Sequence, residues 1–219
     1  MKNLMSNNAP ETFNEKLLLI ENTLNNKGNF TYSNTNYLFL EKIVESVTKK
    51  PFQEVFNKFY SKIDLPNIKI GVNEEGLEAY FGQTEKGSSK VSAWREYYGF
   101  DGGVYTNSKT LDTFLTKLYK DISILKPSTI AQMETWTKME PMTIPIGSGV
   151  IYKYGYGVMK LTYNDQEYVG HPGGTLKYQS FVFYNAKKDI SISVVSNCSG
   201  RYFNNIFFQE LIPAILDEL

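Results

Sequence analysis

The hydrophobic period changes part-way along the chain, and this change constrains the fold more than any other feature of the sequence. Up to about residue 147, apolar residues recur at the three- and four-residue spacing of amphipathic helices. From about residue 148, the chain instead carries short runs that are rich in β-branched and aromatic residues, as strands are. A last helical pattern closes the chain. Helices first and strands afterwards are typical of an α+β fold.

The helical part contains several predicted segments. Helices are expected over Phe13–Leu24, Phe39–Lys49, Phe52–Ile63, residues 111–118 and residues 128–135. In the second of these, the apolar residues at i, i+3, i+4 and i+7 predict one buried face, made of Leu40, Ile43, Val44 and Val47. Thr35 or Asn36 is expected to cap this helix, and Pro51 to separate it from the next.

The second part of the chain is expected to form an antiparallel sheet. The strand-like runs are Val150–Tyr163, Tyr168–His171, Ser180–Tyr184 and Ile190–Ser196. The stretch Ala186-Lys187-Lys188-Asp189 predicts a hairpin turn between the last two runs, and residues 202–219 predict the closing helix.

Composition excludes several classes of protein. The chain has 23 basic and 23 acidic residues, and this balance argues against a strong nucleic-acid binder. Its one cysteine, Cys198, rules out an intramolecular disulfide, and its one histidine, His171, argues against a zinc enzyme. The first residues lack the apolar stretch of a signal peptide, and we expect no membrane span.

Two short motifs carry the chemistry. Tyr32-Ser33-Asn34 stands at the entry to an amphipathic helix, and Gly170-His171-Pro172-Gly173-Gly174 ends a short strand. In this order, the motifs resemble those of the serine β-lactamase-related family, which contains class C β-lactamases, D,D-peptidases and esterases. The resemblance covers roughly residues 11–219.

The resemblance implies a role for each motif residue. Tyr32 is the phenol that shuttles a proton during acylation or deacylation, and Asn34 hydrogen-bonds the amide of the substrate. His171 faces the same cleft as a hydrogen-bond donor or a positive charge. Gly173 and Gly174 leave room for the substrate against the strand. Such chemistry uses no metal and no organic cofactor. Relatives are often exported to the cell envelope, so the location of this chain stays open.

The nucleophile that the resemblance implies is the serine of a Ser-x-x-Lys motif that precedes the Tyr-x-Asn motif. Residues 1–31 contain one serine, Ser6, and it is not followed by such a lysine. Later matches begin at Ser46 and Ser123, and neither is expected to be the nucleophile. We therefore expect a single but incomplete domain over residues 1–219, with a helix-rich part at about 11–147 and a sheet with its closing helix at about 148–219. By the resemblance, the N-terminal helix and first two strands of the family are expected to be missing, and the chain alone is expected to be inactive.

Three functions remain open at this point. The first is a shortened serine hydrolase for a β-lactam, a D-alanyl peptide or an ester. The second is a non-catalytic module that binds a peptide or cell-wall fragment in the remaining half-cleft. The third is an interaction protein: without the family's first strand, Ile190–Ser196 becomes an open edge that invites a homodimer or an aggregate, unless residues 1–10 cover it.

Overall fold

The computed structural model describes residues 30, 32–70, 80–84, 87–90, 102–139, 143–175 and 177–219. The chain forms two compact units, each of which is described by itself. The first contains Met1–Glu75 and Ala93–Thr106, and the second contains Gly76–Ser92 and Asn107–Leu219. The helix predicted over residues 13–24 and the segment 1–10 lie outside the described residues. One domain over residues 1–219 stays a prediction.

In the first unit, two helices stand before a small strand pair. The elements are α2 (Asn34–Thr48), α3 (Phe52–Lys62), β1 (Lys69–Ile70) and β4 (Val104–Tyr105), of which β1 and β4 are antiparallel. The cap predicted for α2 was wrong: the helix begins earlier, and the Ser33 hydroxyl accepts a hydrogen bond from the Thr35 backbone N–H at 3.3 Å. At its other end α2 stops at Lys49, whose φ of 57° is left-handed.

The buried face predicted for α2 was also wrong. Leu40 is 45% exposed, Ile43 57% and Val47 77%. Among the described residues, the helix instead buries Leu38 and Glu41, the latter to 1% exposure. The same face carries Glu45, whose carboxylate accepts the backbone N–H of Phe52 at 3.2 Å and so ties α2 to α3. The apolar residues do recur with the period of a helix, but they lie on the side of α2 opposite Leu38, Glu41 and Glu45.

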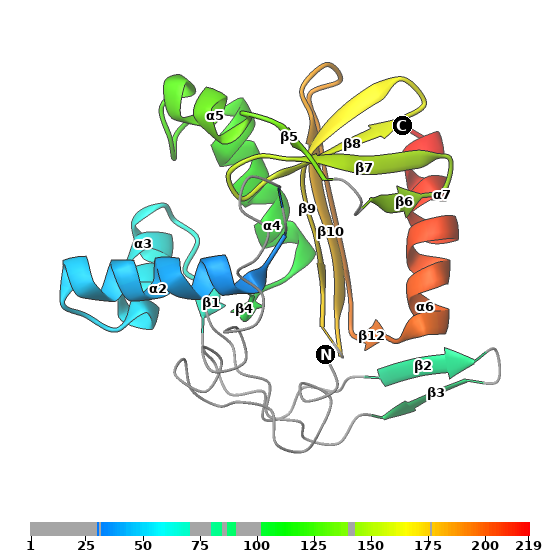
Figure 1. The fold of residues 1–219 in the computed structure, drawn as a ribbon, viewed down its shortest axis with the longest axis horizontal. Helices are drawn as coiled ribbons and strands as arrows, with labels where there is room; N and C mark the ends of the chain where they lie inside the picture. Colours follow the sequence, from blue (N-terminus) through cyan, green and yellow to red (C-terminus); the bar gives the residue numbers. More distant parts are fainter. Residues whose placement is uncertain are drawn as a thin grey trace. The chain divides into compact units, whose positions relative to one another are not determined.

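Among the described residues, the second unit is built on a seven-stranded sheet (Figure 1). Its strand order is β11-β10-β9-β8-β7-β5, with β6 also paired to β7, and every pairing is antiparallel. The strands are β5 (Thr137–Lys138), β6 (Ile144–Ile146), β7 (Gly149–Tyr154), β8 (Met159–Tyr163), β9 (Gln166–Gly174), β10 (Gln179–Asn185) and β11 (Ile190–Ser196).

The sequence predicted the last hairpin of this sheet correctly. Strand β11 has the predicted bounds, and residues 186–189 form the predicted turn. The single run predicted over Val150–Tyr163 divides into β7 and β8, because the chain reverses direction around Gly157, whose φ of 80° is available to glycine at little cost.

Helices cover both faces of this sheet (Figure 1). On one face lies α4 (Ser108–Leu115), which continues as the short π-helix η2 (Thr116–Lys120). On the opposite face lies the C-terminal segment, made of α6 (Arg201–Ile206), the short π-helix η3 (Phe207–Leu211) and α7 (Ile212–Asp217). The core on that side is fully buried at Phe181, Phe183, Phe207 and Ile212. Burial of these large apolar side chains is the main force that holds the segment to the sheet.

Three smaller features complete the second unit. Helix α5 (Pro127–Met133) follows η2. A separate sheet joins β12 (Cys198–Ser199), parallel to β2 (Tyr80–Thr84), with β3 (Gly87–Lys90) antiparallel to β2. Within the described part of the chain, no helix has both the length and the apolar character needed to cross a bilayer.

Gly170 offers a test of this packing. A Cβ atom there would stand 2.0 Å from the Val182 carbonyl oxygen and 2.7 Å from the Phe183 Cα atom. Because backbone cannot yield as a side chain does, we expect Gly170→Ala to lower the free energy of unfolding by about 3 kcal/mol in denaturant titrations. Gly174→Ala is the matched control, since its Cβ would meet only the end of the Gln179 side chain. Equal losses in the two variants would contradict this packing.

Candidate active site

The Tyr-x-Asn motif forms the entry to α2 in the first unit. Tyr32 is half-buried and precedes the cap residue Ser33, and Asn34 is the first residue of the helix and is exposed. The extended backbone of Ser33 (φ −148°, ψ 126°) and its hydrogen bond to Thr35 fix the chain between the two. The amide of Asn34 is thus presented to solvent at the amino end of a 15-residue helix.

His171 lies on β9 in the second unit, on the face of the sheet that α4 covers. Along this strand Tyr168, Gly170 and Pro172 are buried, whereas the alternate residues are half-buried. His171 pairs with Val182, and Val182 in turn pairs with Ser193 on β11. Directly opposite residues of antiparallel strands share a face, so all three project to the same side.

The surroundings of His171 favour its neutral form. Burial lowers the pKa of the imidazole below its ordinary value of 6.5, and the hydrogen bond to its backbone neighbour opposes this only in part. The Nδ1 atom lies 2.5 Å from the Pro172 carbonyl oxygen, which can only accept, so Nδ1 carries the hydrogen. The neutral ring then presents Nε2 as an acceptor. The Tyr154 ring stands edge-on to the imidazole, with centroids 6.0 Å apart.

The end of β9 extends past one of its two neighbours. Pairing with β8 ends at Gly170, whereas pairing with β10 continues from Val169 to Gly174. The stretch from His171 to Gly174 therefore has a side that β8 does not cover among the described pairings. An extended ligand can add to such a side by backbone hydrogen bonds.

The space beside the two glycines is partly filled by their neighbours on β10. A Cβ on Gly173 would stand 2.3 Å from the Ser180 hydroxyl, and one on Gly174 would stand 3.0 Å from the amide oxygen of Gln179. The Ser180 and Gln179 side chains thus occupy the space that side chains at positions 173 and 174 would take. Their predicted role in making room for substrate stays a prediction.

Sequence reasoning missed the residues that hold the turn after β9. The Thr175 hydroxyl accepts the backbone N–H groups of Lys177 and Tyr178, each at 3.0 Å. The Thr175 carbonyl oxygen accepts the Ser199 hydroxyl at 2.7 Å, and that hydroxyl accepts the Gln179 amide at 3.1 Å. A threonine directly after Gly-Gly was the available signal, because Ser and Thr side chains commonly bond the backbone of turns.

The two later Ser-x-x-Lys matches occupy surface positions. Ser46 is exposed in the last part of α2, and Lys49 is the left-handed residue that ends this helix. Ser123 is also exposed, and its hydroxyl donates to the Lys117 carbonyl oxygen at 3.2 Å. Neither arrangement is that of a nucleophile held beside its base.

Comparison with known proteins identifies the family. A family model described as Beta-lactamase matches residues 21–207. The chain belongs to the beta-lactamase family. Both candidate motifs of this family member lie inside the matched range. No curated protein sequence matches it.

Solved structures share its fold. The octameric penicillin-binding protein homologue from Pyrococcus abyssi is 22% identical with a TM-score of 0.73, and the match covers 94% of this chain and 48% of that one. The D-amino acid amidase from Ochrobactrum anthropi SV3 is 16% identical with a TM-score of 0.70, over 88% and 62% of the two chains. A D-stereospecific amidohydrolase from Streptomyces sp. is 21% identical with a TM-score of 0.64, over 84% and 55%. The chain thus spans about half to three-fifths of the length of these solved structures.

The site residues form two groups. Tyr32 and Asn34 stand together in the first unit, and His171, Gly173 and Gly174 stand together on one strand of the second. The convergence of the two groups on one cleft stays a prediction that the family resemblance implies.

The lowered pKa of His171 predicts how stability depends on pH. A group whose pKa is lower in the folded state binds its proton more readily when unfolded, so its contribution to stability is complete above about pH 6.5 and is lost as the pH falls. We expect the difference in unfolding free energy between the parent and His171→Gln to be flat above pH 6.5. Below it, the parent should lose up to about 1.4 kcal/mol per pH unit relative to the variant. Denaturant titrations from pH 5 to 8 measure this, and a parent that gains stability relative to the variant as the pH falls would contradict it.

Proposed function

We propose that this member of the beta-lactamase family serves acyl transfer of the serine-hydrolase type on a β-lactam, a D-alanyl peptide or an ester. In this proposal the chain supplies Tyr32, Asn34 and His171, and the ligand lies along Gly173 and Gly174. The observation that carries it is the end of β9, where a strand bearing the only histidine extends past β8 and offers an uncovered side to an extended acyl ligand.

The chemistry of the residues supports these roles. In acyl transfer, a serine oxygen attacks the carbonyl carbon, the amine or alcohol leaves with a proton, and water later releases the acyl group. A phenol such as Tyr32 can pass that proton, provided that a nearby positive charge or hydrogen bond tunes it. A neutral His171 carries no charge near neutral pH, so it suits a neutral polar group of the ligand better than a carboxylate.

The nucleophile is the part of this proposal that the chain does not visibly supply. The serines of its two Ser-x-x-Lys matches are exposed, in the last part of α2 and in the connection after η2. We therefore propose that the 219-residue chain alone binds rather than turns over its ligand. This keeps the non-catalytic binding module as the second candidate function.

Intact mass measurement tests for a nucleophile. We expect the folded chain to show no added mass after incubation with a β-lactam or, separately, with a fluorophosphonate probe, because neither exposed Ser-x-x-Lys serine is placed as a nucleophile. A stoichiometric adduct would contradict this. Peptide mapping to Ser33, Ser46 or Ser123 would then identify the nucleophile within the chain.

Ligand titration tests the binding half of the proposal. We expect saturable binding of a D-alanyl-D-alanine peptide in the millimolar range by NMR, and a loss of at least tenfold in affinity for His171→Ala. The matched control is Lys187→Ala, which removes an exposed side chain from the turn before β11. The absence of binding at several millimolar peptide, or equal affinities in the two variants, would overturn it.

A partner is the third element of the proposal. Among the described strands, β11 has β10 as its only neighbour in the sheet, as expected of an open edge. We propose that two copies of the chain associate through this edge. Such a homodimer is compatible with either ligand-related function, because it uses a different strand from β9.

A further inference from the structure

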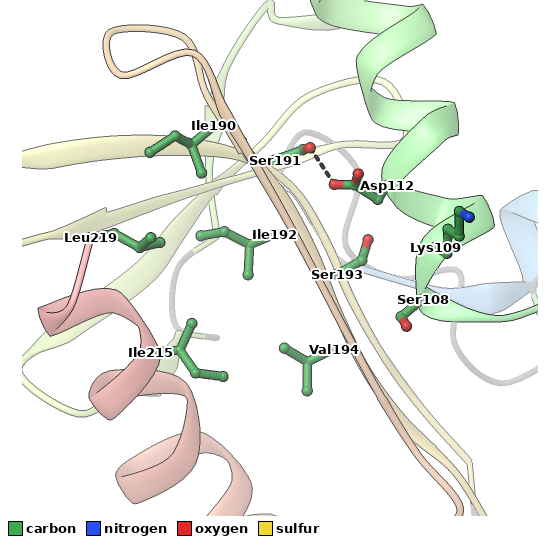
Figure 2. Close-up of a pocket in the computed structure, with 10 residues that line it drawn as sticks. All are labelled: Ser108, Lys109, Asp112, Ile190, Ser191, Ile192, Ser193, Val194, Ile215 and Leu219. Atoms are coloured by element: carbon green, nitrogen blue, oxygen red, sulfur yellow. Dashed lines mark hydrogen bonds between the residues drawn. The ribbon is translucent and has the colours of Figure 1, made fainter.

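The edge strand β11 lies along the floor of an open groove of about 410 Å³ in the second unit (Figure 2). One wall is apolar and comes from Ile215 and Leu219 of the C-terminal segment. The other wall is polar and comes from Ser108, Lys109 and Asp112 of α4.

The side chains of β11 alternate to match these walls. Figure 2 shows Ile190, Ile192 and Val194 on the side of the C-terminal segment, and Ser191 and Ser193 on the side of α4. The Ser191 hydroxyl is hydrogen-bonded to the Asp112 carboxylate and so anchors α4 to the edge. A strand that adds to β11 must therefore present apolar residues on one face and small polar residues on the other.

β11 lacks the features by which proteins usually protect an edge. Its seven residues include no charged side chain and no proline, and its register with β10 is regular from Ile190 to Ser196. Native edges are commonly blunted by lysine, proline or a bulge. The strand is therefore an uncharged template, and the groove that holds it carries one cation and one anion. Such a groove suits an uncharged strand, and β11 of a second copy is one.

Two-fold symmetry restricts how two copies of β11 can pair. Antiparallel pairing about an axis perpendicular to the sheet keeps each face of the sheet continuous, so residues of one face must oppose residues of the same face. Of the registers that satisfy this, only the one centred on Ser193 pairs all seven residues, because Ser193 is the midpoint of the strand. It places Ile192 opposite Val194 of the partner subunit, which joins the two apolar faces.

We infer that the chain forms a two-fold homodimer in which β11 pairs antiparallel with β11 of a second copy, in the register centred on Ser193. The paired edges make one continuous sheet across both subunits. This inference specifies the homodimer proposed above and does not depend on the hydrolase proposal. Its tests use neither ligand nor turnover, so the two can fail separately.

Cysteine cross-linking tests the register. In a Cys198→Ser background, Ser193→Cys places two thiols opposite each other, within the roughly 4.4–6.8 Å between Cα atoms that a disulfide needs. We expect most of this variant to run as a disulfide-linked dimer after mild oxidation. Ser191→Cys is the matched control, because its two copies are four residues apart along the strand, or roughly 13 Å, and should stay monomeric.

Light scattering after size-exclusion chromatography tests the edge itself. We expect the parent to have the mass of a dimer at micromolar concentration. Val195→Lys, which adds a charge at an exposed edge position, should shift it to a monomer with an unchanged circular dichroism spectrum. Lys187→Ala should remain dimeric.

Three results would overturn the inference. A parent that is monomeric at all concentrations shows that β11 does not pair with β11 of a second copy. A dimer that survives Val195→Lys and lacks the Ser193→Cys cross-link uses a different surface. Cross-linking of Ser191→Cys in preference to Ser193→Cys shows a different register.

Discussion

The close approach of β10 to Gly170 is the contact on which the second unit depends. Because Gly170 has no side chain, the Val182 carbonyl oxygen and the backbone of Phe183 come within the space that a Cβ would fill. Phe183 lies beside Phe181, two residues away on the same strand, with ring centroids 4.3 Å apart, on the apolar face that the C-terminal segment covers. The pairing of Gly170 with Phe183 is part of the register of β9 on β10, which determines the face to which His171 points. Core packing and the orientation of the candidate residue thus meet at this glycine.

The sheet offers two different edges to a ligand or partner. One is the last part of β9, where the strand extends past β8 and carries a half-buried, neutral histidine. The other is the whole length of β11, which is uncharged and lies between one apolar wall and one polar wall of the groove. The first offers an imidazole beside backbone that β8 does not cover among the described pairings. The second has the repetitive backbone pattern that suits another strand.

Much of this fold could be predicted from the sequence where local pattern and packing agree. The bounds of β11 and its turn followed from the alternation over residues 190–194 and from the stretch 186–189, and α3 followed from its period and the preceding proline. The buried face of α2 could not be predicted, since Leu40, Ile43 and Val47 mark a stripe without saying what lies against it, and Glu41 is buried instead. His171 could be singled out as the only histidine, but its tautomer depends on the Pro172 carbonyl oxygen and its pKa on burial, neither of which the sequence records.

The Ser199 hydroxyl, three residues beyond the end of β11, holds the Thr175 carbonyl oxygen in the turn that follows the His-Pro-Gly-Gly stretch. A strand that pairs with β11 and stiffens it therefore lies close along the chain to Ser199. The hydrogen bond of Ser199 holds the backbone that follows the end of β9. If assembly shifts the position of Ser199, it changes ligand affinity, and thermodynamic reciprocity then requires that ligand change the strength of assembly by the same factor. In the cell, the concentration of the protein would itself become an effector of its binding site.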